Sequence, residues 1–127
     1  MPEIPNLWPD VLPEAELITP LSILKAQGAS LGNRTNHLLE GDTSSHSTYL
    51  GEFEHKFYIY APILDYRLEI IKIDHPLDFY PIQASAWGME SVEIPNEEQF
   101  LQWVKKVLSS DRTTKAIQSL LAQVKSA

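Results

Sequence analysis

The stretch FEHKFYIYAPILDYRLEIIKI, residues 53–73, decides the fold class of this chain. Apolar and polar residues alternate on both sides of Pro62, and a period of two is typical of β-strands. A turn at 62–65 would pair the two halves as an antiparallel hairpin in which Phe57 faces Ile70. The register is well specified, because a slip of one residue would expose the whole apolar set.

More strands extend this hairpin into a sheet. Residues 79–87 are predicted to form a third strand, and the polar residues 42–48 are either a loop or the tip of a hairpin whose first strand begins near Leu39. One sheet face is then apolar, with Phe53, Phe57, Ile59, Tyr66, Leu68, Ile70, Ile82 and Ala84. The opposite face is predicted to hold Tyr58, Tyr60, Ile71, Ile73, Phe79 and Trp87 among charged residues. Monomers rarely leave large apolar patches bare, so we expect part of this second face to be covered.

A helix is predicted to precede the sheet. Thr19 is a good N-cap and Pro20 suits the first helical position. A stripe of apolar and small residues follows at helical spacing from Leu17 to Leu38, and Gly41 would lie just past the helix end. Gly28 lies on this stripe, which suggests that another backbone passes close to it.

Two further helices are predicted after the sheet, capped by Asn96 and Asp111. Residues 19–127 are therefore expected to be a single α+β domain. It would contain an N-terminal helix, a three- to four-stranded antiparallel meander sheet and two C-terminal helices.

Residues 1–18 are predicted to be a separate Pro-rich arm. Four prolines exclude a long helix or a central strand here, yet the segment also carries Ile4, Leu7, Trp8, Val11 and Leu12. A disordered tail rarely carries so much apolar surface. We expect the arm to pack, either on the core of its own chain or on a second subunit or partner.

Composition excludes several classes of protein. The chain has 127 residues, a net charge of −7 and no cysteine, so a disulfide framework or a cysteine-based metal site is impossible. An acidic surface repels a phosphate backbone, so no nucleic-acid partner is expected. No apolar run is long enough to cross a membrane, and the first residues do not resemble a signal peptide. We therefore expect a cytoplasmic protein without membrane contact.

The net charge is unevenly distributed. Residues 1–100 hold 16 acidic and 5 basic residues, whereas residues 101–127 hold 1 acidic and 5 basic residues. The basic C-terminal helices could dock on the acidic body, present a solvated face or meet an acidic partner protein.

No motif points to catalysis. The chain lacks a phosphate-binding glycine loop, a nucleophile elbow and a zinc-protease motif, so no catalytic residue is assigned and an enzyme is not expected. N/O metal ligands are available from Glu40, Asp42, His46, Glu52, Glu54 and His75, but their spacing matches no metal pattern. We therefore expect no metal site and no cofactor.

The motifs do not identify a family, and the sequence has the general look of a small bacterial α+β protein. The first hypothesis is a non-enzymatic protein that acts by protein–protein contact and forms a homodimer. Its interface would comprise Trp8, Gly28, Tyr58, Tyr60, Ile71, Ile73, Phe79 and Trp87.

Two other hypotheses stay open. The chain could bind a small molecule or a metal in a pocket between the helices and the sheet, lined by His55, Tyr60, Tyr66, Trp87 and Trp103. It could also be an immunity-type or chaperone-like protein whose acidic body neutralises a basic partner protein.

Overall fold

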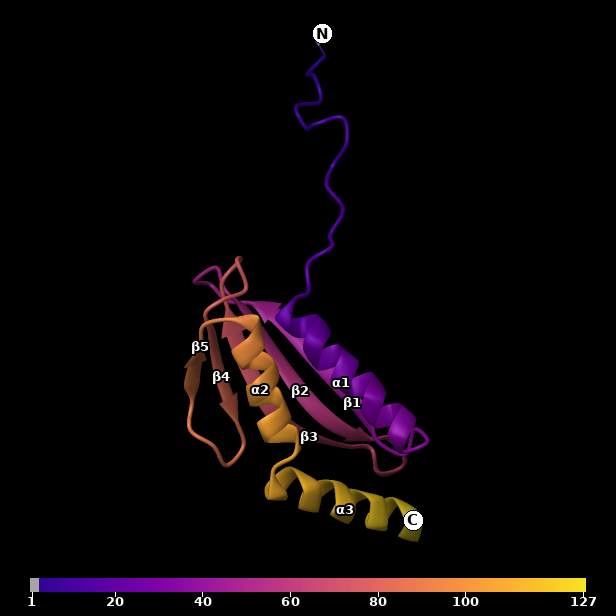
Figure 1. Ribbon diagram of the computed structural model, residues 1–127. Coiled ribbons are helices and arrows are strands. Elements are labelled where there is room, and N and C mark those ends of the chain that lie inside the picture. Colours follow the sequence, from indigo (N-terminus) through magenta and orange to yellow (C-terminus); the bar gives the residue numbers. More distant parts are fainter. Residues whose placement is uncertain (1–2) are drawn as a thin grey trace.

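This computed structural model describes residues 3–127 of the chain. These residues form a five-stranded antiparallel sheet with helices on one side (Figure 1). The elements in chain order are α1 (Pro20–Arg34), β1 (Glu40–Ser47), β2 (Phe53–Ala61), the short 3-10 helix η1 (Pro62–Leu64), β3 (Tyr66–His75), β4 (Ile82–Ala86), β5 (Val92–Ile94), α2 (Glu97–Leu108) and α3 (Asp111–Ser126). The strands lie side by side in sequence order, as a meander. The expected α+β class is confirmed, but the described sheet has five strands rather than three or four.

Two strands account for the difference. The polar segment 42–48, expected as a loop or a hairpin tip, mostly forms β1, and the turn that follows lies between Ser47 and Phe53. The alternative in which a first strand begins near Leu39 is therefore the correct one. β5 lies between the predicted third strand and the predicted helix capped by Asn96, and its three residues are too few to show a period of two.

The register between β2 and β3 contains a β-bulge that the sequence pattern does not reveal. Ile59 pairs with Leu68 as predicted, but Phe57 pairs with Ile71 instead of Ile70. The extra residue reverses the facing of every residue that follows it in β3. Ile73, expected on the outer face, is therefore buried in the core. β4 shifts with β3.

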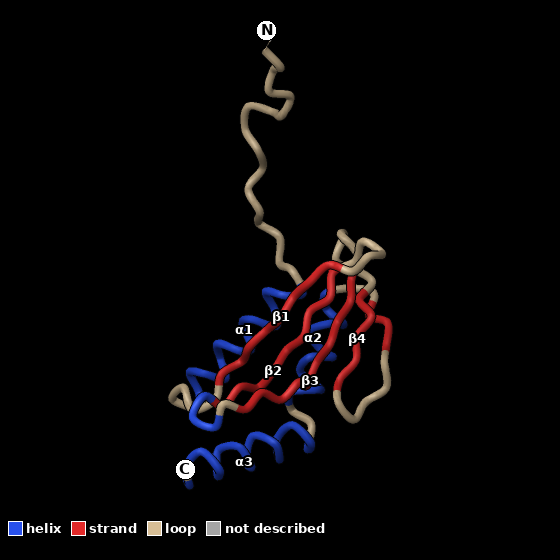
Figure 2. Tube along the Cα trace, turned by 180° about the vertical axis from the view of Figure 1, so that it is seen from behind, coloured by secondary structure: helices blue, strands red, loops and turns tan. Residues whose placement is uncertain are grey.

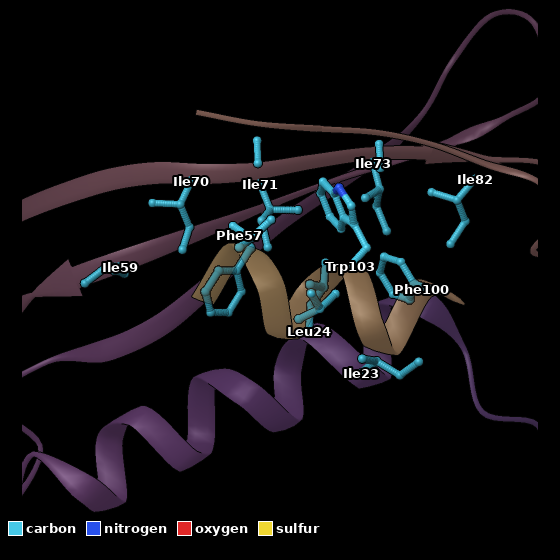
Figure 3. Close-up of a cluster of buried hydrophobic side chains, with 14 of the residues drawn as sticks. Ile23, Leu24, Phe57, Ile59, Ile70, Ile71, Ile73, Ile82, Phe100 and Trp103 are labelled. Carbon is cyan, nitrogen blue, oxygen red and sulfur yellow. The ribbon is translucent and has the colours of Figure 1, made fainter. Parts of the chain in front are cut away.

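The hydrophobic core lies between the sheet and helices α1 and α2. Figure 3 shows central side chains of this core, and those that it labels come from α1, α2 and strands β2, β3 and β4, among them Leu24, Phe57, Ile71, Ile73, Ile82 and Phe100. Seen from behind, the strands lie in front of α1 and α2, so these helices cover only one face of the sheet (Figure 2). None of the helices in residues 3–127 is long and apolar enough to cross a membrane.

Two glycines bring α1 against β1. A Cβ atom on Gly28 would lie 2.9 Å from the Cα of Gly41, and one on Gly41 would lie 2.0 Å from the Cα of Gly28. The expectation that another backbone passes Gly28 is confirmed, and that backbone belongs to the same chain. The expected helix end near Gly41 is wrong, because α1 ends at Arg34 and Gly41 is the second residue of β1.

We predict that Gly41→Ala destabilises the fold by about 3 kcal/mol or more, because a methyl group would meet backbone that cannot move aside. Urea unfolding measures the change. Ser30→Ala, at an exposed position of α1, is the control and should change the stability by less than about 0.5 kcal/mol. Equal stabilities of the two variants would contradict the close contact.

Candidate functional site

The N-terminal arm, defined here as residues 3–18, is the most exposed apolar part of the molecule. Seven of its side chains are exposed by 58–90 %, namely Ile4, Leu7, Trp8, Val11, Leu12, Leu17 and Ile18. Figures 1 and 2 show it extending away from the domain in both views. The alternative in which the arm packs on its own core is therefore wrong for the described structure.

A capping box holds the root of the arm. The Thr19 hydroxyl accepts a hydrogen bond from the backbone N–H of Ser22, and the Ser22 hydroxyl accepts one from the backbone N–H of Thr19, both at 3.0 Å. This reciprocal pair satisfies two donors at the start of α1 and sets the direction in which the chain enters the helix. The arm therefore leaves the domain from a rigid point.

The helical face of the domain contains a groove between α1 and α2 that is lined by both aliphatic and polar side chains. Its walls include Ile23 on α1 and Leu101, Val104 and Leu108 on α2, and its volume is about 420 Å³. The groove continues into a hollow of about 330 Å³ beside the start of α3, and the two share Gln27, Arg34 and Leu108. Leu31, Phe57, Ile59 and Ile117 add apolar surface to the hollow. We call these two connected spaces the helical-face groove.

The basic residues of the helices have no acidic partner. All seven lie on α1, α2 or α3, namely Lys25, Arg34, Lys105, Lys106, Arg112, Lys115 and Lys125, and none forms an ion pair within residues 3–127. Arg112 instead lies over the ring of Trp87, 4.6 Å from its centroid. Docking of the C-terminal helices on the acidic body, one of the expected alternatives, thus involves no ion pair of these cations within residues 3–127.

The outer face of the sheet, which α1 and α2 leave uncovered, is polar and internally paired. Lys56 lies 3.6 Å from Glu69, and Lys72 lies 3.6 Å from Glu54. Arg67 pairs with Asp42, and its guanidinium lies 5.0 Å from the centroid of the Tyr58 ring. Each basic residue on the strands thus has an acidic neighbour, so this face offers little unbalanced charge to a partner.

A buried pair of histidines joins β2 to β3 on the core side. The Nε2 atoms of His55 and His75 are 2.9 Å apart, and the two side chains are only 6 % and 5 % exposed. His55 Nδ1 lies 2.7 Å from the hydroxyl of Ser45, and His75 Nδ1 lies 2.8 Å from the carbonyl oxygen of Pro76. The pair therefore belongs to a chain of hydrogen bonds that runs from β1 to the end of β3.

The carbonyl of Pro76 fixes the direction of this chain when both histidines are neutral. A carbonyl oxygen can only accept, so His75 donates from Nδ1 and must accept at Nε2. His55 then donates from Nε2 and accepts from the Ser45 hydroxyl at Nδ1. Burial, followed by the nearby charge of His75, lowers the pKa of His55 from 6.5 to about 4. So weak a base cannot activate Ser45 effectively at neutral pH, and we interpret the chain of hydrogen bonds as a structural feature.

The structure separates the residues that the sequence grouped as an interface. Tyr58 and Tyr60 lie on the outer face, as expected, and are half-buried. Ile71 and Ile73 are 1 % and 0 % exposed, so their expected place on that face is wrong, and the bulge in β3 is the reason.

The other members of the predicted interface are also dispersed. Trp8 is exposed on the arm, whereas Gly28 is buried against β1. Phe79 packs edge-on against His75, with the ring centroids 6.1 Å apart. The indole N–H of Trp87 donates to the Thr113 hydroxyl at 3.3 Å, so Trp87 helps to hold α3 against the sheet.

Only two of the five predicted pocket residues line one space. Tyr66 and Trp87 lie together beside α3, along a shallow groove that includes Leu120. His55 and Trp103 are buried in the core, and Tyr60 lies on the outer face of the sheet. No group of three or more acidic or histidine side chains within residues 3–127 is placed to hold a metal ion.

Sequence reasoning missed the histidine pair and the helical-face groove. The predicted pairing of Phe57 with Ile70 would place His55 opposite Lys72 and His75 opposite Glu52. The observed register places them opposite Ile73 and Phe53. Their 20-residue separation gives no local signal, so only the correct register could have brought them together.

Comparison of the chain with known protein families, with curated proteins and with solved structures gives no significant match. Function is therefore inferred from the geometry of the chain itself.

We predict that acidification destabilises the fold through His55. The unfolded state binds a proton at a pKa near 6.5 and the folded state only near 4, so stability is lost as the pH falls between these values. The loss is about 3 kcal/mol at most. Asp74 opposes it at the acidic end of the range, because burial and then Glu54 raise the pKa of Asp74 in the folded state.

Urea unfolding at several pH values between 7 and 4 measures this dependence. His55→Phe should flatten the profile, whereas Ser30→Ala, at an exposed position without a titratable side chain, should leave it unchanged. A profile that is the same in wild type and His55→Phe would rule out His55 as the source.

Proposed function

We propose that this chain is a non-enzymatic bacterial protein of the cytoplasm that acts by protein–protein contact and forms a homodimer through its N-terminal arm. One observation carries the proposal. Seven apolar side chains of the arm are exposed in a single copy of the chain. Apolar surface on this scale is favourable only when it is removed from water, and another protein molecule can do so.

The arm is better suited to this role than the face first expected. The basic residues on the outer face of the sheet form ion pairs with acidic residues of the same face. Ile71 and Ile73, which were predicted on this face, are buried in the core instead. Aromatic side chains commonly supply much of the binding energy of an interface, and Trp8 is 73 % exposed on the arm.

We predict a molar mass of twice 14.4 kDa at micromolar concentration, as measured by light scattering coupled to size exclusion. Trp8→Ala should raise the dimer dissociation constant at least tenfold, about 1.4 kcal/mol, because it removes the largest apolar side chain of the arm.

Tyr49→Ala is the matched control. Tyr49 is also aromatic and is 97 % exposed, but it lies in the turn between β1 and β2. Its substitution should leave the mass unchanged. A 14.4 kDa wild-type species, or an equal effect of both substitutions, would contradict the proposal.

The hollow beside α3 supports a second candidate function, the binding of a small molecule. Its volume of about 330 Å³ is at the lower end of the range for ligand pockets. A ligand of the folded state would raise the melting temperature in a panel of metabolites. Ile117→Trp would fill the hollow and should abolish that rise. A panel without any shift would remove this candidate.

A further inference from the structure

We propose that the helical-face groove receives the arm of a second copy of this chain, with Trp8 seated in the hollow beside α3. This inference rests on the proposed homodimer and specifies which surface of the partner the arm contacts. In a twofold dimer each copy would supply one arm and one groove, which is the symmetry that most homodimers adopt.

The lining of the groove suits a segment that, like the arm, carries both apolar and acidic residues. Four aliphatic side chains line the groove beside four polar ones, and Leu101 among them is 46 % exposed. The hollow at its end holds about 330 Å³. A dry cavity of about 150 Å³ can bind benzene, so this hollow has room for an indole ring. Trp8 carries the only indole on the arm.

Charge complementarity points to the same pairing. The arm carries four acidic residues and no basic one, namely Glu3, Asp10, Glu14 and Glu16. Arg34 and Lys105 line the groove, and neither forms an ion pair within residues 3–127. The acidic residues of the arm have no ion pair there either. The acidic arm and the two cations that line the groove thus carry charges of opposite sign that no ion pair in the described residues neutralises.

The point where the arm leaves the domain favours a second copy over the same chain. The hollow lies beside the C-terminal half of α1, at Ser30, Leu31 and Arg34, whereas the arm leaves from the N-terminus of that helix and extends away from it (Figure 1). To reach its own hollow, the arm would have to reverse its direction next to the capping box. The 12 residues from Trp8 to Pro20 can span about 40 Å, which is enough to reach a neighbouring copy.

The test is a charge swap between the arm and the groove in the full-length chain. The arm variant is Asp10→Lys with Glu14→Lys, and the groove variant is Arg34→Glu with Lys105→Glu. All four positions are exposed, so circular dichroism should show both variants folded. Each variant alone repels its own copies and should be monomeric by light scattering at low salt. An equimolar mixture should form the dimer, because each arm then meets a groove of opposite charge.

Lys125→Glu is the matched control, since it reverses a cation of α3 that does not line the groove. It should leave the wild-type dimer intact. A mixture that stays monomeric would overturn the proposal.

A groove variant that dimerises alone as tightly as wild type would overturn the location of the site and leave the proposed homodimer standing. A monomeric wild type would overturn both proposals. In that case the fluorescence of Trp8 is obtained by subtracting the emission of the Trp8→Phe variant from that of the wild type. Protection of this fluorescence from quenching by acrylamide would show that the arm occupies the groove of its own chain.

Discussion

The β-bulge between β2 and β3 is the constraint on which the rest of the structure depends. One extra residue, beside Phe57, turns Ile71, Ile73 and His75 toward the helices. Because these side chains face the helices, the inner face of the sheet is mainly apolar, and the charged residues lie on the outer face. The same shift places His75 within hydrogen-bonding distance of His55. The core, the polar outer face and the histidine pair therefore have one common origin.

The distribution of charge separates the molecule into parts with different roles. Basic residues on the strands are balanced by neighbours such as Glu54 and Glu69, whereas those on the helices are not. Exposed ion pairs contribute little to stability, so the pairing on the sheet matters mainly because it leaves no net attraction there. Within residues 3–127 the cations without an ion pair lie on the helices, and the arm combines acidic residues that form no ion pair with exposed apolar side chains.

The alternation of residues in 53–73 was enough to predict the fold class and the pairing of Ile59 with Leu68. The bulge could not be predicted, because the adjacent apolar residues Ile70 and Ile71 fit either register. β5 was too short to leave a periodic signal, and β1 is polar because it lies at an edge of the sheet. The apolar character of the arm was visible in the sequence. The helical-face groove was not, because its walls come from segments that only the folded chain brings together.

The edge formed by β1 has a consequence for how copies of the chain can associate. An unpaired strand of eight residues can recruit further strands, and such growth has no natural end. Here α1 packs along β1 through the Gly28–Gly41 contact, and the side chains of Ser44–Ser47 are small or polar and exposed. Pairing of a further strand with this edge would bury almost no apolar surface. Open-ended sheet growth from this edge is thereby disfavoured.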